Sequence, residues 1–439
     1  FVKTEKAIQA IVQHPCRELS GEFQFIVLSY PKWGEDERLY FNDIESQIRS
    51  SIVEWEKNGF SDEDLEMVKT KIESDIINQK MSLSSKVTSI SSWEWLGKGN
   101  HNISSEIKRY NNVTREDVMR VYKQYIKNRN AVIMNVSPKN PFSDEELVLE
   151  SFNPNSNIKI ENDPQYSNLN YVKPNSNYDI CCRKEQPEPK ESIIPKVPEY
   201  YTNKFENGIK VIGTEYSEVP KVFLQIKIDG GNVFDDKKRK GLSSLTAELM
   251  NKSTQNYSNE EMEIALSKIG SEISFTSSGN STTIFVSSFT KKLDETLLLL
   301  EEKLFNPGFN EEDFNTLKKQ QIEFLNSQMK SNEYVASTKF REILFGDTPY
   351  GYTADEKSIK KIKIKHIVEF YNNYYVPSLS TITIVGDISK ENIIDKLSFL
   401  ENWNSKNNIN LTNNFEYPED GPTQIYLIDK PGVTQSVIY

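Results

Sequence analysis

Two blocks of this chain match each other at a constant spacing. Three pairs of segments share one offset, 308 − 59 = 249 residues: 59–65 with 308–314, 96–97 with 345–346, and 113–125 with 362–374. Three matches in a single register indicate a duplicated domain, and the period is far longer than that of solenoid repeats. We therefore predict that residues 20–139 and roughly residues 270–390 share one fold.

Helix starts can be read directly from the sequence. Ser61 stands before an apolar segment of helical periodicity, and Asp64 follows at the spacing of a capping box, with a shorter acid than usual. Thr114 and Asp117 repeat this pattern and predict a second helix start. Further along the chain, residues 242–250 have the apolar periodicity of another helix.

Strand-like segments alternate with these helices. Residues 23–28 form one such segment, residues 131–136 close the first block, and residues 380–386 close the second. The Asn207-Gly208 pair predicts a type I′ hairpin turn between two further strands. Interleaved strands and helices of this kind are typical of an α+β fold, in which helices pack on one sheet.

The composition and the apolar periodicity of the sequence divide the chain into four parts. Residues 1–142 and 199–420 are patterned, whereas residues 143–198 are rich in Asn, Pro and Ser and indicate a linker. The last part, residues 421–439, stops inside a strand-loop-strand pattern. Because the chain also begins in mid-pattern at Phe1, we expect it to be a fragment of a longer protein.

Composition argues against several classes of protein. The net charge is 53 − 64 = −11, and because an acidic surface repels phosphates we expect no nucleic-acid partner. No apolar run is long enough to span a bilayer, so no transmembrane segment is predicted. The three cysteines, Cys16, Cys181 and Cys182, lack the spacing of a zinc site and indicate free thiols.

Several segments occur in the order that is found in one peptidase family. Residues 205–211 (FENGIKV), 226–231 (IKIDGG) and 240–254 (KGLSSLTAELMNKST) resemble the start of an insulinase/pitrilysin-type repeat. Residues 345–351 (FGDTPYG) resemble the family's loop before its later helices, and residues 429–436 resemble the start of the second half of such a repeat. Each segment is a loose match by itself, and the shared order makes the resemblance specific.

The resemblance implies a domain plan. Each repeat of this family of zinc metallopeptidases (inverzincins) holds two α+β domains with a mostly antiparallel sheet covered by helices, as in mitochondrial processing peptidase-like metallohydrolases. Residues 1–142 are then the C-terminal part of the second domain of a first repeat, and residues 143–198 join the repeats. Residues 199–420 are the first domain of a second, inactive repeat, and residues 421–439 begin the following domain.

The resemblance also locates the position of the catalytic motif. The family's catalytic helix carries H-x-x-E-H, in which two histidines bind Zn²⁺ and the glutamate is the general base. In this chain Ser244 and Glu248 stand in the place of the histidines, and Ala247 stands in the place of the base. A serine hydroxyl is a poor zinc ligand and alanine cannot accept a proton. We therefore expect no catalytic residue and no metal site in this chain.

Other residues do not replace the lost ligands. The three histidines are His14, His101 and His366, and none lies four positions from another. Acids such as Glu263 and Glu323 are plentiful, but acids alone favour hard cations over zinc. The sequence contains neither a Gly-rich phosphate loop nor a G-x-S-x-G elbow.

Two functions from different classes remain open. In the first, the chain is the non-catalytic portion of a zinc-dependent metalloendopeptidase and binds a peptide or unfolded polypeptide in a two-repeat clamshell, with the linker as the hinge. In the second, the chain belongs to a catalytically dead family member that is a binding or assembly subunit for an active partner. An H-x-x-E-H motif upstream of Phe1 would separate the two.

The cofactor, partner and location follow from the same resemblance. Zinc is expected in the full-length protein and not in this chain. The expected partner is the catalytic repeat, either upstream in the same protein or in a separate subunit, and the substrate would extend a sheet edge as an added strand. Because bacterial members with two repeats are often exported, we expect a periplasmic or secreted location.

Overall fold

The computed structural model describes residues 1, 6–15, 17, 20–29, 37–79, 81–97, 102–136, 197–404, 409, 415–416, 418 and 421–430. The chain splits into two compact units. One consists of Phe1–Tyr30, Ile44–Asn130 and Glu199–Tyr439, and the other of Pro31–Asp43 and Ala131–Pro198. The expected linker at 143–198 lies outside the described residues except for its last two residues, 197 and 198. Cys181 and Cys182 within it are not described, and neither are Cys16 and His101.

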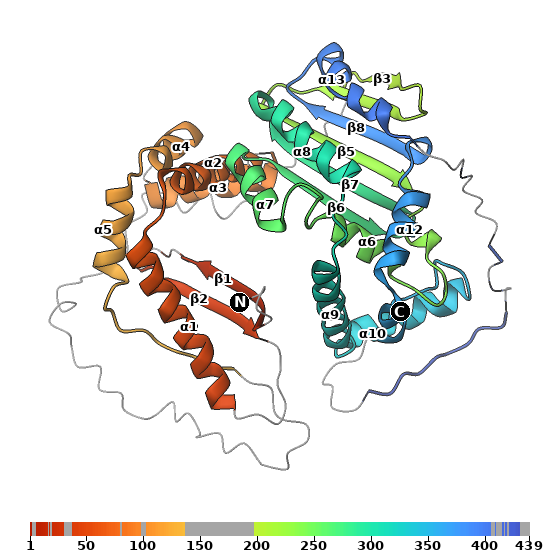
Figure 1. Cartoon of the computed structure of the whole chain (residues 1–439), viewed down its shortest axis with the longest axis horizontal. Helices are drawn as coiled ribbons and strands as arrows, with labels where there is room; N and C mark the ends of the chain where they lie inside the picture. The colour runs from red at the N-terminus through yellow and green to blue at the C-terminus, as the bar shows by residue number, and fades with distance from the viewer. Residues whose placement is uncertain are drawn as a thin grey trace, which may run out of the picture. The chain divides into compact units, whose positions relative to one another are not determined.

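One open sheet of six strands organises the second half of the chain (Figure 1). The strands are β3 Tyr201–Lys204, β4 Lys210–Glu215, β5 Lys221–Asp229, β6 Glu272–Ser278, β7 Ser281–Phe289 and β8 Ser380–Gly386. Their order across the sheet is β3-β4-β8-β5-β7-β6. Within this sheet β4 and β8 run parallel and every other neighbouring pair is antiparallel, which confirms the prediction of a mostly antiparallel sheet.

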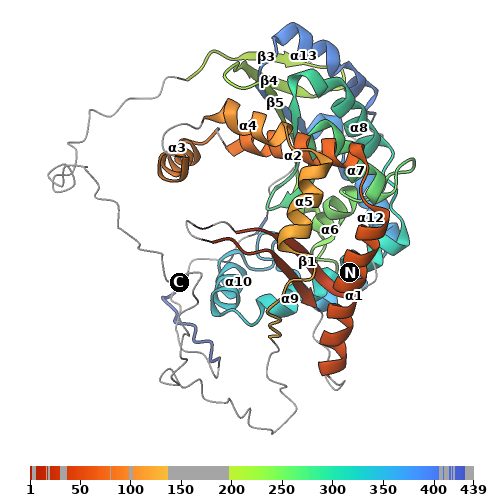
Figure 2. The ribbon, with the colours of Figure 1, turned by 90° about the vertical axis from the view of Figure 1, so that its left-hand side faces the viewer.

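Helices pack against one face of this sheet, as expected for an α+β fold (Figures 1 and 2). Four helices contact its strands: α6 Leu242–Met250, α7 Asn259–Ile269, α8 Leu293–Phe305 and α13 Lys390–Lys396. Three more pack on other helices, namely α9 Glu311–Gln328, α11 Glu356–Lys361 and α12 Ile364–Tyr374, and α10 Asn332–Phe345 follows α9 in the chain. Short 3-10 turns include η2 Gly231–Phe234 and η5 Ser398–Asn402. The helix predicted at residues 242–250 is α6, with the same bounds.

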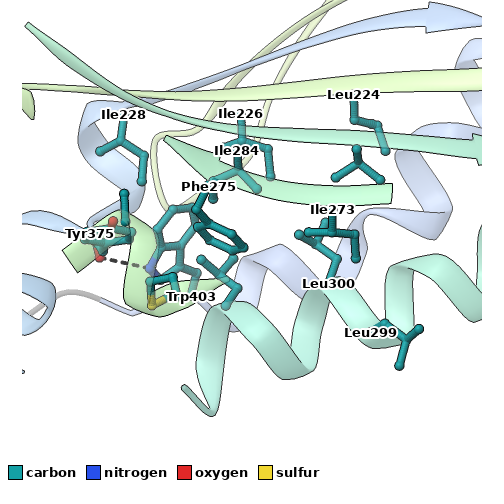
Figure 3. Packing of buried hydrophobic residues seen from close by; sticks show 14 of the residues in the cluster. Leu224, Ile226, Ile228, Ile273, Phe275, Ile284, Leu299, Leu300, Tyr375 and Trp403 are labelled. Carbon is teal, nitrogen blue, oxygen red and sulfur yellow. Dashed lines mark hydrogen bonds between the residues drawn. The ribbon is translucent and has the colours of Figure 1, made fainter. Parts of the chain in front are cut away.

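Strand β5 shows how the two faces of the sheet differ. Leu224, Ile226 and Ile228 are at most 2% exposed, whereas Gln225 and Lys227 between them are exposed. Figure 3 shows other side chains of the same core: Ile273, Phe275, Ile284, Leu300 and Trp403. Burial of each such side chain stabilises the fold by about 1.5–3 kcal/mol, so the helix-covered face holds the domain together.

The first block is mostly helical among its described residues. Strand β1 Ala7–Gln13 pairs antiparallel with β2 Gln24–Ser29. The helices are α1 Glu37–Asn58, α2 Asp62–Gln79, α3 Leu83–Gly97, α4 Ile103–Asn111 and α5 Arg115–Tyr125. In the described part of the whole chain, no helix has both the length and the apolar character needed to cross a bilayer.

Both predicted capping boxes form. The Asp64 N–H donates to Ser61 Oγ at 3.1 Å, and the Ser61 N–H donates to the Asp64 carboxylate at 2.8 Å. Thr114 and Asp117 make the same reciprocal pair of bonds, each at 3.2 Å. These bonds satisfy N–H groups that have no partner within the helix, and they fix where α2 and α5 begin.

The helices of the two blocks recur at the predicted offset. Helix α2 begins at Asp62 and α9 at Glu311, which is 311 − 62 = 249 residues later, and both have 18 residues. Helix α5 begins at Arg115 and α12 at Ile364, which is 364 − 115 = 249 residues later, and both have 11 residues. The duplication read from the sequence therefore extends to the positions of these helices.

Two segments expected to be strands are not strands in the structure. Residues 131–136 have no secondary structure, and Val132 is 98% exposed. A strand needs a neighbour for its backbone groups, and no described strand pairs with this segment, so the prediction is wrong. Residues 421–430 likewise contain no strand, and Ile425 is 95% exposed.

The hairpin between β3 and β4 forms, but its turn is not of type I′. A type I′ turn needs positive φ at both central residues, whereas Gly208 has a φ of 100° and Asn207 does not have a positive φ. The Gly208 N–H donates to the Phe205 carbonyl and the Phe205 N–H donates to the Ile209 carbonyl, both at 3.0 Å. This pattern is a three-residue loop with a glycine bulge. Asn207 Nδ2 also donates to the Leu400 carbonyl at 2.7 Å, a tertiary contact that the dipeptide pattern does not contain.

Candidate functional site

The helix that carries the motif positions, α6, is buried on most of its surface. Leu245, Ala247 and Leu249 are at most 1% exposed. Helix α6 packs against β6, α9 and α12, and it begins after Gly241, whose φ of 91° lies in the region that favours glycine. Because neighbours enclose α6, the directions of its side chains are fixed by packing.

Asp235 holds the N-terminal end of α6. Its carboxylate accepts the N–H of Gly241 at 2.7 Å and the N–H of Ser243 at 2.8 Å. Burial raises the pKa of Asp235 to about 6, although both backbone hydrogen bonds act in the opposite direction. Asn232 extends the network, because its Oδ1 accepts the Ser243 hydroxyl at 2.6 Å. Asp235 and Asn232 were not candidates from the sequence, where they precede the helix in a polar loop.

The three motif positions lie on two turns of α6: Ser244 on one turn, and Ala247 and Glu248 on the next. Ser244 and Glu248 are four residues apart and share a half-buried face of the helix, as two metal-binding histidines would. The Ser244 hydroxyl donates to the Ser277 backbone carbonyl on β6 at 3.0 Å. Ala247, in the place of the general base, is 0% exposed and packs in the hydrophobic core. Two of the three positions therefore contribute to the fold.

Glu248 is the motif position that keeps an ionisable group. Burial raises its pKa, and the nearby Lys252 acts in the opposite direction. Since a metal ligand must be deprotonated, this environment disfavours ligation. Among the described residues, no group of three His, Cys, Asp or Glu side chains could hold a metal ion. The residues present on α6 do not fit the zinc ion that the family uses.

Asn251, directly after α6, joins this helix to β6 through its side chain. Its Nδ2 donates to the Phe275 carbonyl at 2.8 Å, and its Oδ1 accepts the Phe275 N–H at 2.7 Å. The side-chain amide thus makes the pair of bonds that a neighbouring strand would make. Sequence reasoning missed Asn251, because its partner lies 24 positions away and a polar residue after a helix is ordinary.

Lys303, on α8, fixes the C-terminal end of α6. The residue is 1% exposed, and its Nζ donates to the Asn251 carbonyl at 2.8 Å. Burial lowers the pKa of Lys303 to about 8, while Glu263 raises it and Lys252 lowers it further. A cation at this place also matches the partial negative charge of a helix C-terminus.

The other residues considered for metal binding lie on separate elements. His14 follows β1 in the first block. His366 is on α12, where its Nδ1 accepts the Lys363 N–H at 3.1 Å, and burial and nearby cations lower its pKa. Glu263 is exposed on α7 and Glu323 is half-buried on α9. The structure does not bring these residues together into one cluster.

Two protein-family models match the part of the chain that contains α6 and most of the six-stranded sheet. The model of the insulinase family (peptidase family M16) matches residues 211–354, and the model of the peptidase M16 inactive domain matches residues 361–439. Together the two matches cover about half of the chain. The chain belongs to the insulinase (M16) family. The resemblance inferred from the ordered segments is thereby confirmed.

The curated relatives share low identity with this chain. Mitochondrial-processing peptidase subunit beta of Bos taurus is 22% identical over 212 residues, which are 47% of this chain and 42% of the relative. A non-peptidase homolog, YmxG of Helicobacter pylori, is 22% identical over 192 residues, which are 43% of this chain and 44% of the relative. The matches span less than half the length of these relatives.

Two solved structures also match about half of the chain. A peptidase M16 inactive domain from Pseudomonas fluorescens has 20% identity and a TM-score of 0.47, covering 49% of this chain and 53% of that one. A protease from Helicobacter pylori has 18% identity and a TM-score of 0.48, covering 51% of this chain and 55% of that one.

Proposed function

We propose that this chain is the non-catalytic portion of an M16 zinc metalloendopeptidase, in which it encloses and binds a peptide opposite an active repeat. One observation carries the proposal: α6 is complete as a buried helix and lacks the chemistry of the motif. The Ser244 hydroxyl is hydrogen-bonded to the Ser277 carbonyl, and Ala247 is buried in the core. Within the described residues, Glu248 belongs to no group of three His, Cys, Asp or Glu side chains that could hold a metal ion. A domain that keeps its fold without catalytic groups can still present its surface to a peptide.

The uncovered face of the sheet supports the binding role. On β5 and β7 the rings of Phe223 and Phe285 lie 6.3 Å apart between centroids, and Phe285 is 37% exposed. Gln225 and Thr383 are exposed on the same face. A face that combines aromatic rings with small polar side chains can contact many peptide sequences, since apolar area and hydrogen-bonding groups are both available.

A second function is favoured by one relative. The Helicobacter pylori homologue is described as a non-peptidase. The full-length protein would then be catalytically dead and would be a binding or assembly subunit for an active partner. The two functions differ in one feature outside this chain, because only the first requires an H-x-x-E-H motif in the upstream part of the reading frame. A periplasmic or secreted location belongs to both proposals, and a signal peptide in that reading frame would support it.

The binding role can be tested by substitution on the uncovered face. Phe285→Lys replaces one of the two rings with a charged side chain. It should weaken capture of dye-labelled casein, an unfolded polypeptide, at least about fivefold, because aromatic contact area dominates such binding. Fluorescence anisotropy with the purified 439-residue chain measures this affinity.

Phe324→Lys is the matched control. Phe324 is 54% exposed and lies on α9, away from the strands, so its replacement should leave capture unchanged. Equal affinities for the wild type and both variants, or no capture by the wild type, would remove the support for peptide binding at this face. Neither result would affect the absence of catalysis, which is measured separately.

A further inference from the structure

Strand β6 forms one edge of the six-stranded sheet, beside α6. It pairs with β7 on one side only. In an antiparallel pair, alternate residues direct both backbone groups toward the neighbour and the residues between them direct theirs outward. Because Asn251 bonds both backbone groups of Phe275, the outward set contains Ile273, Phe275 and Ser277.

Three of the six outward backbone groups of Ile273, Phe275 and Ser277 are already paired from within the domain. The Asn251 amide bonds both groups of Phe275. The Ser244 hydroxyl donates to the Ser277 carbonyl at 3.0 Å. Just past the strand, the Asn232 N–H of η2 donates to the Gly279 carbonyl at 2.9 Å. Each partner belongs to α6, to the residue after it, or to the turn before it.

The position of Asn251 is fixed at three points. Its backbone carbonyl accepts from the buried Lys303 Nζ at 2.8 Å, and its backbone N–H donates to the Glu248 carbonyl at 3.2 Å. Its side chain bonds Phe275, whose ring is 1% exposed in the core. A side chain held in this way is ordered before any ligand arrives, so it competes for the strand edge without a further entropic cost.

We propose that Asn251 closes the β6 edge to strand addition, so that a peptide held by this repeat contacts the uncovered sheet face and does not extend the sheet beside α6. An added strand must break the two bonds between Asn251 and Phe275 to form two of its own, so it gains nothing at the centre of the edge. It must also displace the Ser244 hydroxyl from Ser277. This inference rests on the proposed binding function, which supplies both the peptide and the sheet face that it contacts.

Disulfide trapping tests this assignment on the full chain. Thr276 is exposed on β6, and Thr276→Cys in a chain whose three native cysteines are changed to serine places one thiol at the edge. The probe is a lysine-flanked peptide of alternating valine and threonine with one central cysteine. Asn251→Leu, of similar size, should raise the yield of mixed disulfide about tenfold over the same chain with Asn251, because Phe275 then has free backbone groups.

Two further measurements keep the test decisive. Asn256→Leu is the matched control, because Asn256 bonds the Glu302 carboxylate away from β6, and it should leave trapping unchanged. Hydrogen exchange should be faster at the Phe275 amide in Asn251→Leu and unchanged at Val286 on β7, which shows that the domain is folded. If Asn251→Leu does not fold, Asn251→Asp, which keeps an acceptor for the Phe275 N–H and loses the donor to its carbonyl, should give an intermediate yield.

The outcomes separate this inference from the proposed function. Equal trapping with Asn251 and with Leu at this position would overturn it, as would a released Phe275 amide without a rise in trapping. Neither result depends on zinc or on a natural substrate, so neither affects the absence of catalysis. Conversely, zinc-dependent cleavage by this chain would refute the proposed function and leave the trapping result unchanged.

Discussion

The Ser244 hydroxyl donates to the Ser277 carbonyl at 3.0 Å, which links the first turn of α6 to the edge of the sheet. By the resemblance of residues 240–254 to the family's catalytic helix, Ser244 is expected to stand in the place of the first zinc-binding histidine. An imidazole at that position must direct a nitrogen toward a metal, whereas the short serine side chain reaches the neighbouring strand. At this position the structure has a hydrogen bond between a helix and a strand, and a serine hydroxyl is a poor zinc ligand.

Ser244→Ala should destabilise the domain modestly. The Ser277 carbonyl loses its donor at a half-buried position, for which we expect a fall of about 0.5–1.5 kcal/mol in the free energy of unfolding. Denaturant unfolding measures this change. Ser327→Ala on α9 is the control, because Ser327 is exposed in a helix and should shift stability by no more than about 0.5 kcal/mol. A Ser244→Ala variant as stable as the wild type would show that the bond contributes little.

Asp235→Asn should change how stability depends on pH. Burial raises the pKa of Asp235 to about 6, from the 3.8 that is usual for an aspartate. A carboxyl whose pKa is higher in the folded state than in the unfolded state stabilises the folded state when the pH lies below the unfolded-state pKa. This contribution to the free energy of unfolding is lost as the pH rises from about 4 to about 6. The variant should therefore gain about 3 kcal/mol relative to the wild type over that interval. Chemical unfolding at a series of pH values provides the comparison.

Asp236→Asn is the opposing control for that experiment. Partial burial raises the pKa of Asp236, but hydrogen bonds from Arg239 and Lys238 outweigh this effect and lower it overall. The charged Asp236 therefore stabilises the folded wild type at neutral pH, and this contribution is lost as the pH falls through the lowered pKa. Because Asp236→Asn lacks the contribution, its free energy of unfolding should fall relative to that of the wild type as the pH rises. The same pH dependence in both variants would contradict the account of the α6 cap.

Lys303→Met should remove a contribution to the free energy of unfolding that changes with pH in the alkaline range. Burial lowers the pKa of Lys303 from 10.5 to about 8, so the folded state releases its proton before the unfolded state does. In the wild type this contribution makes stability rise between about pH 8 and pH 10, by up to about 3 kcal/mol. The variant should lack that rise in denaturant unfolding. An equal rise in both proteins would show that burial does not lower the pKa of Lys303 in the folded state.

Much of the helical framework could be predicted, because its signals are local. The capping boxes at Ser61 and Thr114 place the polar cap and the first turn within four residues, so the sequence alone indicates α2 and α5. The same applies to α6, whose apolar periodicity sets both of its ends. The offset between the blocks extended these predictions to α9 and α12.

The errors concern features that depend on distant partners. Residues 131–136 have strand-forming composition, but a strand requires a neighbour, and none of the described strands pairs with them. The turn at Asn207 and Gly208 has the residues of a type I′ turn and adopts a three-residue loop, with Asn207 bonded to Leu400. In both cases contacts with residues far away in the sequence determine the local structure, and a short stretch of sequence does not contain those contacts.

The site was only partly predictable for the same reason. The positions Ser244, Ala247 and Glu248 follow from a motif, which is contiguous in sequence. The bonds that replace the metal chemistry join Asn251 to Phe275 and Lys303 to Asn251, which are 24 and 52 positions apart. No local pattern relates these residues before the sheet and the helices are assembled.

Metal content is the most direct test of the central claim, which is that α6 has exchanged its zinc chemistry for structural contacts. The purified chain is incubated with excess zinc sulfate, passed through a desalting column, and measured by inductively coupled plasma mass spectrometry alongside cleavage of a fluorogenic peptide. The account predicts zinc far below one ion per chain and no cleavage above the buffer rate. One zinc ion per chain with chelator-sensitive turnover would contradict it.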